Sequence, residues 1–230
     1  MIENQEAEKL CRSAELIAQC LFDDHVLHVF GSGHSHVLAE EISRRAGGLV
    51  CVNPILDTNY TLLAGAPSKS RIFERLEGYS EAVLDSYILY PGEVIIIVSS
   101  SGINPSSVGA ALYSKKKGLK VISITSIEHS SSLPSRHSSG LKLYQVSDIY
   151  IDTHVPIGDA IIEIAPNIPK VCPISTIIGA SILQALIGQV VQAMLIIGNP
   201  NMHIWESANT INGDSKNREK YLKYPNRYKP

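Results

Sequence analysis

Val94–Ser107 reads VIIIVSSSGINPSS and decides the fold that we predict for this chain. Its first five residues are β-branched and apolar without alternation, which is typical of a strand covered on both faces of a parallel sheet. Three serines and a glycine follow at the carboxyl end of that strand, where open α/β sheets hold their ligands. The helix expected next would point its free N–H groups at the same place. The stretch predicts either a phosphate-binding turn or an ordinary Ser/Gly turn between a strand and a helix.

The composition narrows the class of protein. A chain of 230 residues is long enough for one α/β domain with a substantial core. The formal net charge of −2 gives no electrostatic reason to expect nucleic acid as a partner. Because no basic segment followed by an apolar one opens the chain, we expect no signal peptide and a cytoplasmic protein. The cysteines form no C-x-x-C pair, which argues against a disulfide framework and a structural zinc site: Cys11, Cys20, Cys51 and Cys172.

Val171–Gly198 carries no charged residue and is long enough for a membrane-spanning candidate. Its flanks lack aromatic belts and a Lys/Arg bias, and several polar side chains interrupt it. We therefore expect a central helix buried against the sheet or a partner subunit, and no membrane. Such a helix is too apolar to face water, which predicts a homodimer or a higher oligomer such as a tetramer.

Strand-like and helix-like segments alternate along the chain. This alternation predicts an α/β fold with three αβα layers and a five-stranded, doubly wound parallel sheet. We expect one domain, residues 1–230, with an N-terminal helix in 1–22, a core in 24–198 and a polar C-terminal arm in 199–230. The expected strands are Val26–Phe30, Leu49–Asn53, Val94–Val98, Leu119–Thr125 and Ser147–Thr153, with a short one at Ile161–Ile164. The expected helices are Ile2–Phe22, Leu38–Ala46, Arg71–Leu89 broken at Gly78, Pro105–Lys117 and Pro173–Ile197, and the expected loops are Thr58–Ser70 and Ser126–Gly140.

A second turn, Gly31–His36 (GSGHSH), also follows a strand and opens a helix. It differs from a dinucleotide fingerprint because the third glycine is replaced by His36, and Asn53 stands where an acidic residue would end the second strand. A nucleotide-dependent oxidoreductase is therefore the weakest hypothesis. A turn that binds a smaller polar ligand through Ser32, Ser35 and backbone N–H groups fits better.

Three segments together, F-G-S-G-H-S, I-V-S-S-S-G-I-N-P-S and K-G-L-K-V-I-S-I-T-S, resemble the SIS (sugar isomerase) domain family. The resemblance covers about residues 24–198. It implies phosphosugar binding on a five-stranded parallel sheet with helices on both faces. The segment S-R-H-S-S-G around His137, G-D-A at Gly158–Ala160 and S-A-N-x-x-x-G-D in the tail are similar to a stand-alone subgroup often labelled phosphoheptose isomerase.

The resemblance also implies which residues bind the substrate. Ser99 and Ser101 match the serines that hold the phosphate, and Gly102 lets the backbone approach it. Asn104 falls where many members carry Thr or Ser, although an amide can still donate to phosphate. The middle residue of the triplet, Ser100, should point away. The expected binding residues are Ser32, Gly33, Ser35, Ser99, Ser101, Gly102, Asn104 and Ser106. At the start of the last helix, Ser175 and Thr176 either add donors to the ligand or cap the helix.

Aldose–ketose isomerisation needs a base that moves a proton between adjacent carbons, and often a group that opens the ring. The candidates are Glu41, His154, Glu40 and His34, with His137 and Glu163 as further possibilities. Each of them is open to a plainer interpretation as a helix charge or a turn residue. The metal-binding His/Glu/Gln set of phosphoheptose isomerases is not recognisable, and Ile162 stands where its Gln would be. We therefore expect no metal and no other cofactor.

The leading hypothesis is an isomerase that acts on a phosphorylated sugar or amino sugar through a cis-enediol(ate) intermediate. A non-catalytic phosphosugar sensor would share the phosphate-binding turns but would need no base. A phosphosugar lyase or deaminase of the same fold would differ in its substrate.

Overall fold

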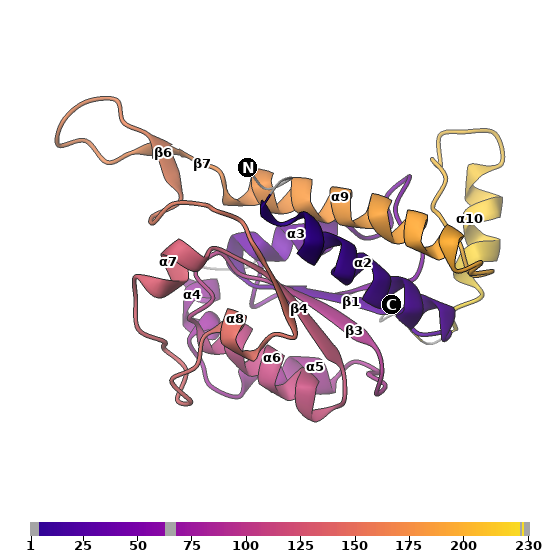
Figure 1. Cartoon of the computed structure of the whole chain (residues 1–230), viewed down its shortest axis with the longest axis horizontal. Coiled ribbons are helices and arrows are strands. Elements are labelled where there is room, and N and C mark those ends of the chain that lie inside the picture. The colour runs from indigo at the N-terminus through magenta and orange to yellow at the C-terminus, as the bar shows by residue number, and fades with distance from the viewer. Residues whose placement is uncertain (1–4, 63–67, 226, 228–230) are drawn as a thin grey trace.

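The computed structural model describes residues 5–62, 68–225 and 227. Its centre is a five-stranded sheet in which every neighbouring pair of strands is parallel, in the order β2-β1-β3-β4-β5 (Figure 1). This is the predicted sheet. The strands are β1 (Leu27–Gly31), β2 (Val52–Ile55), β3 (Val94–Val98), β4 (Lys120–Thr125) and β5 (Ile149–Asp152).

Helices cover both faces of the sheet, and the side chains of β3 alternate between two cores. Val94, Ile96 and Val98 belong to one core, and Ile95 and Ile97 belong to the other. The first core lies under α2 (Ala7–Phe22), α3 (His36–Glu41) and α9 (Ser175–Ile196). The second lies under α5 (Tyr79–Asp85), α6 (Pro105–Lys116) and α8 (Leu143–Val146), with α4 (Lys69–Glu74) beside α6. Two covered faces explain why β3 is uniformly apolar and fully buried.

The chain leaves β1 and β3 toward opposite faces of the sheet. The two strands are neighbours, with Gly31 opposite Val98 at their carboxyl ends. After β1 the chain turns through a 3-10 turn, Gly33–Ser35, into α3 on one face, whereas after β3 it enters α6 on the other. Loops that diverge in this way open a crevice, and this switch point is where open α/β sheets bind ligands.

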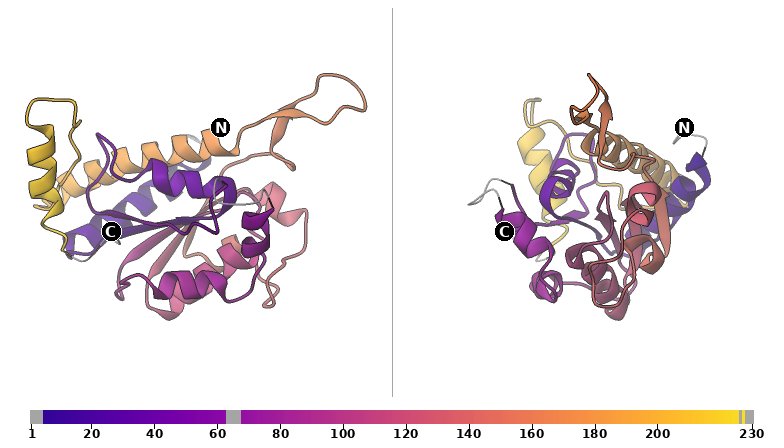
Figure 2. Two further views of the ribbon diagram at one scale, coloured as in Figure 1. Left: turned by 180° about the vertical axis from the view of Figure 1, so that it is seen from behind. Right: turned by 90° about the vertical axis from the view of Figure 1, so that its left-hand side faces the viewer.

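A two-stranded antiparallel hairpin, β6 (Ala160–Ile162) and β7 (Val171–Pro173), lies outside the main sheet. It projects from the body of the molecule in both the front and back views (Figures 1 and 2). Its apolar side chains are exposed, with Ile164 at 65%. Asp159 holds its base, because its carboxylate accepts hydrogen bonds from the Ile174 N–H at 3.0 Å and from the Ser175 N–H and hydroxyl at 2.7 and 2.6 Å.

The C-terminal arm is fixed to the amino ends of the strands, at the end of the sheet opposite to the switch point. After α10 (Gly213–Tyr221), the Arg227 guanidinium pairs with Glu93, which is fully buried just before β3. Glu93 also accepts hydrogen bonds from His28 Nε2 at 2.9 Å and from the Tyr90 N–H at 2.8 Å. Burial alone would raise the pKa of Glu93, but these partners outweigh it and lower the pKa to about 2.

Several predicted element bounds need correction. The helix after β1 starts at His36 and ends at Glu41, not Ala46, because the chain turns at Arg44, where φ is 49°. The second strand is Val52–Ile55 and includes Pro54, which is tolerated because β2 is an edge strand. The break predicted at Gly78 is confirmed, with φ of 77° between α4 and α5.

Three segments contain a helix or a strand that was not predicted, and Pro173 belongs to one of these strands instead of to the predicted helix Pro173–Ile197. The loop after β4 begins with α7 (Ile127–Ser131), and β7 occupies Val171–Pro173 ahead of α9. The C-terminal arm contains α10. Part of the predicted loop Thr58–Ser70, residues 63–67, lies outside the described residues, as do residues 2–4 of the predicted first helix.

Candidate functional site

The two serine-bearing turns meet at the switch point, as the sheet order requires. The Ser32 hydroxyl, after β1, lies 3.1 Å from the Ser106 hydroxyl at the start of α6. Gly33 follows with φ of 58°, and its N–H donates to the Tyr60 carbonyl at 2.9 Å. Residues from loops 74 positions apart in the chain therefore share one hydrogen bond.

The turn after β3 presents free donors at the same edge. Ser99 Oγ accepts a hydrogen bond from the Gly102 N–H at 3.2 Å, which closes the turn. Gly102 has φ of 59°, and a Cβ there would lie 2.8 Å from Thr125 Oγ1, so a larger residue does not fit. Within the described residues, the N–H groups of Ser100, Ser101 and Ser106 have no hydrogen-bond acceptor. Such a turn at a helix N-terminus is suited to an anion.

Glu74, the last residue of α4, completes the arrangement. Its Oε2 lies 3.4 Å from Asn104 Nδ2, and a Cβ at Gly33 would clash with its carboxylate. Burial raises the pKa of Glu74, while the Ser32 hydroxyl and the charges of Arg75, His34 and Arg136 oppose the rise. A half-buried carboxylate with a raised pKa, beside an anion-binding turn, is equipped to take up a proton.

Arg136 lies on the outer side of Asn104. Its Nη1 donates to Asn104 Oδ1 at 2.9 Å, so the Asn104 amide is shared between Arg136 and Glu74. We call these five residues, Ser32, Glu74, Asn104, Ser106 and Arg136, the polar cluster.

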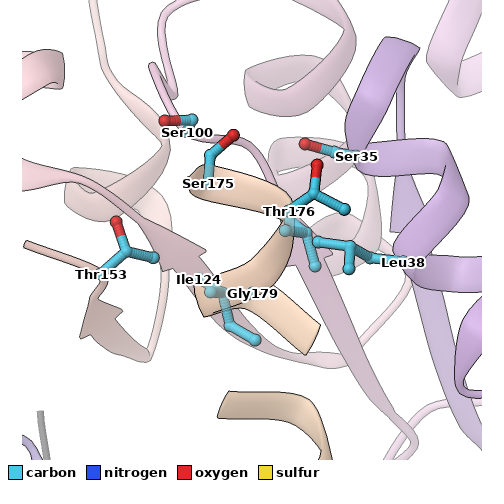
Figure 3. Close-up of a pocket in the computed structure, with 9 residues that line it drawn as sticks. Ser35, Leu38, Ser100, Ile124, Thr153, Ser175, Thr176 and Gly179 are labelled. Atoms are coloured by element: carbon cyan, nitrogen blue, oxygen red, sulfur yellow. The ribbon is translucent and has the colours of Figure 1, made fainter. Parts of the chain in front are cut away.

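A second, smaller site lies on the α9 side of the same loops. It is lined by hydroxyls of Ser35, Ser100, Thr153, Ser175 and Thr176 above the apolar floor of Leu38, Val98, Ile124 and Gly179 (Figure 3). The Ser100 hydroxyl is buried there without a hydrogen-bond partner among the described residues. Ser100 therefore faces the core opposite to Ser99, as the alternation along β3 implies. Ser175 lines this pocket while it also bonds to Asp159.

The two helix carboxylates predicted as catalytic have local partners. Glu41 pairs with Arg45 one turn along, and Glu40 accepts a hydrogen bond from His36 Nδ1 at 2.8 Å. Neither contacts the polar cluster within the described residues. His34 is exposed and close enough to Glu74 to lower its pKa.

The other histidines and Glu163 lie elsewhere. His154 follows β5, where its ring is 3.3 Å from Glu6 and 3.5 Å from Asp152. His137 lies 3.4 Å from Glu77. Glu163 directly follows β6, between the two strands of the projecting hairpin. In the described parts of the chain, no three His, Cys, Asp or Glu side chains are grouped as a metal site.

Glu74 and Arg136 are the two residues that sequence analysis did not single out. Glu74 lay within a helical stretch, with no Ser/Gly pattern beside it to suggest a ligand. Arg136 stood next to His137 in the long polar loop after β4, whose length was the available signal.

Comparison with known proteins identifies the family and the fold. A family model described as the SIS domain matches residues 1–126. A UPF0309 protein of Caldanaerobacter subterraneus subsp. tengcongensis is 41% identical over 229 residues, covering 98% of this chain and 92% of that protein. A UPF0309 protein of Brucella anthropi is 37% identical over 221 residues, covering 96% of this chain and 89% of that protein.

Two solved structures share the fold. The phosphoheptose isomerase GmhA from Neisseria gonorrhoeae superposes with a TM-score of 0.54 at 16% identity, covering 83% of this chain and 89% of that chain. A phosphoheptose isomerase from Francisella tularensis gives a TM-score of 0.52 at 16% identity, with the same coverage of both chains. At this identity they bear on the fold, and they confirm the predicted fold class.

Proposed function

Because this chain belongs to the SIS domain family, and within it to the UPF0309 proteins, we propose that it binds a phosphorylated sugar at the polar cluster and interconverts its aldose and ketose forms. The names of its structural neighbours, phosphoheptose isomerases, support this substrate class. The observation that carries the proposal is Glu74, a half-buried carboxylate of raised pKa set against the Ser32–Ser106 hydroxyl pair.

In this proposal the phosphate binds at the turn after β3. Ser99 and Ser101 supply hydroxyls, and the free N–H groups of the turn and of α6 point at the same anion. Gly102 allows the backbone to approach. Ser32 and Ser106 are then proposed to face the sugar, because their hydroxyls lie together and Ser32 also bonds to Glu74.

Glu74 is proposed as the base, in place of Glu40, Glu41 and His154. It removes the proton from the carbon next to the carbonyl, which leaves a cis-enediolate, and it returns that proton to the former carbonyl carbon. The proton of the adjacent hydroxyl moves to the former carbonyl oxygen, and that hydroxyl oxygen becomes the new carbonyl oxygen. The proton balance closes within the substrate and Glu74, so the step needs no external reagent. His34, which lies near Glu74, is proposed as the group that opens the sugar ring.

The test separates binding from turnover. A thermal-shift screen with hexose, amino-sugar and heptose phosphates should raise the melting temperature with at least one of them, and NAD should not. Glu74→Gln should keep that binding within about threefold and lower turnover by a factor of about 10² or more.

Each result of the screen has a distinct meaning. If no sugar phosphate stabilises the protein, the proposal is wrong. Binding without turnover across the whole panel would favour the phosphosugar sensor, and release of ammonia or a cleaved sugar would favour the deaminase or lyase.

We also propose that the protein is a cytoplasmic homodimer or tetramer in which a second copy covers α9. This helix is long and apolar enough to cross a membrane, yet part of it packs on α2 and the sheet. Its outer face exposes Ile177, Leu195 and Ile196, the last at 78%. Ile196 also lines an open groove of about 470 Å³ between α2 and the C-terminal half of α9, which the second copy is proposed to fill.

A further inference from the structure

The loop after α7 is fastened to the phosphate-binding turn through Arg136. The Arg136 N–H donates to the Ile103 carbonyl at 2.8 Å, and its guanidinium donates to Asn104 at 2.9 Å. The backbone and the side chain of Arg136 are thus both bonded to the segment that joins β3 to α6.

The same loop has a second anchor on its other side. The Ser138 N–H donates to Glu77 at 2.8 Å, and the His137 ring lies 3.4 Å from the same carboxylate. The Ser135 hydroxyl donates to the Leu141 carbonyl at 2.6 Å across the base of the loop. With both ends tied down, Arg136 is held over the start of α6.

The Arg136 guanidinium carries a positive charge and has N–H donors that no described residue uses. It is exposed, and within the described chain no carboxylate lies at ion-pair distance from its guanidinium, whose one hydrogen bond is to Asn104. A guanidinium presents several N–H donors in a planar fork that matches the oxygens of a phosphate. The donors that Asn104 does not use are therefore available to an anion at the neighbouring turn.

A phosphate at this turn also needs a positive charge nearby. Hydroxyls and N–H groups are neutral, and the negatively charged Glu74 belongs to the same cluster. Arg136 bonds to the Oδ1 atom of Asn104, whereas Glu74 lies near its Nδ2 atom. A phosphate at the turn after β3 would therefore have the Arg136 guanidinium nearby as well as the Glu74 carboxylate.

We propose that Arg136 binds the phosphoryl group of the substrate and that Asn104 is the positioning residue that holds the guanidinium in place. This inference rests on the proposed function and adds the charged ligand that distinguishes a phosphorylated sugar from a free one. It also gives Asn104 a role, because its amide accepts from Arg136 and donates to Glu74 at once.

The experiment measures the dissociation constant of inorganic phosphate, and of any sugar phosphate that stabilises the wild type, by titration calorimetry. Arg136→Gln should weaken binding about tenfold or more, as expected for the loss of a charge-assisted hydrogen bond. Arg136→Lys, which keeps the charge but lacks the planar fork, should recover only part of the affinity. Arg71→Gln, on the exposed face of α4, is the matched loss of one charge and should bind within about twofold of the wild type.

Asn104→Ala tests the positioning role in a double-mutant cycle. If Asn104 acts through Arg136, its loss should cost little further affinity in the Arg136→Gln background. Additive losses would overturn the positioning role. Circular dichroism and thermal unfolding of each variant check that the fold is retained.

The outcomes separate the two claims. If the wild type binds a sugar phosphate and Arg136→Gln binds it equally well, the role of Arg136 is wrong while the proposed function stands. If neither phosphate nor any sugar phosphate binds the wild type, the proposed function itself fails.

Discussion

At the scale of single residues, Gly31 sets the shape of the first serine turn. A Cβ on Gly31 would overlap the Ser35 carbonyl, which is backbone and cannot swing aside. Any larger residue must therefore move the turn that carries Ser32.

This gives a prediction with a matched control. Gly31→Ala should lower the melting temperature and abolish the thermal shift by a sugar phosphate. Gly188→Ala, in the interior of α9, adds a Cβ that meets nothing within 4 Å. It should keep the ligand-induced shift, because it leaves both serine turns unchanged. Differential scanning fluorimetry with and without ligand measures both, and a normal ligand response in Gly31→Ala would contradict the prediction.

How much of the site could be predicted from sequence depended on where each residue finds its partner. Ser32 and Ser106 were predictable, because carboxyl ends of parallel strands meet at one edge even when the residues are far apart in the chain. Glu74 was not, because its position beside Asn104 follows from the packing of α4 against α6. Glu40 pairs with His36 and Glu41 pairs with Arg45, each within one helical turn. This i,i+4 spacing is visible in the sequence, and it argues against a catalytic role for either carboxylate.

At the scale of elements, the strand with a strong sequence pattern was predicted correctly. The strand with a weak pattern was predicted without its pairing partner. β3 matches its prediction, since an unbroken β-branched run has one stable environment. The short strand predicted at Ile161–Ile164 exists as β6, but it pairs with β7 outside the main sheet. A three-residue strand carries too little sequence pattern to reveal its partner.

The outer face of α9 supports a prediction about assembly. Ile196→Asp places a charge on the apolar face that a second copy is proposed to cover, and it should shift the protein toward the monomer. Ile211→Asp, at a residue 91% exposed outside α9, is the control and should leave the assembly unchanged. Size-exclusion chromatography with light scattering gives the mass. A monomeric wild type, or an Ile196→Asp variant of unchanged mass, would contradict the proposal.

At the scale of the whole molecule, the alternation of strands and helices predicted a five-stranded parallel sheet, and the structure has it. The ion pair that joins the C-terminal arm to the start of the central strand was not predictable, because nothing near Arg227 in the sequence points to Glu93. It depends on the full path of the chain around the sheet.

The Glu93 cluster predicts a pH dependence of stability. Because the folded state lowers the pKa of Glu93 from 4.5 to about 2, its contribution is present above pH 4.5 and is lost as the pH falls toward 2. The shift corresponds to stability on the order of 3 kcal/mol. Denaturant unfolding of the wild type between pH 5 and 2 should therefore show a falling free energy of unfolding.

Two variants test the source of this dependence. Glu93→Gln should be less stable near neutral pH and should show a shallower fall over the same pH window. Arg227→Gln should lower the free energy of unfolding. Part of the pH dependence should remain, because His28 still bonds to the Glu93 carboxylate. An identical pH profile for wild type and Glu93→Gln would show that other carboxyl groups cause the acid sensitivity.

The separation of Glu93 from Arg227 also has a consequence for synthesis. The two residues are 134 positions apart, so a ribosome adds Arg227 well after Glu93. At about 5–20 residues per second, on the order of ten seconds pass between them. During that interval the nascent chain can bring His28 to Glu93 but lacks the Arg227 guanidinium, so the Glu93 cluster is completed only after Arg227 has been added.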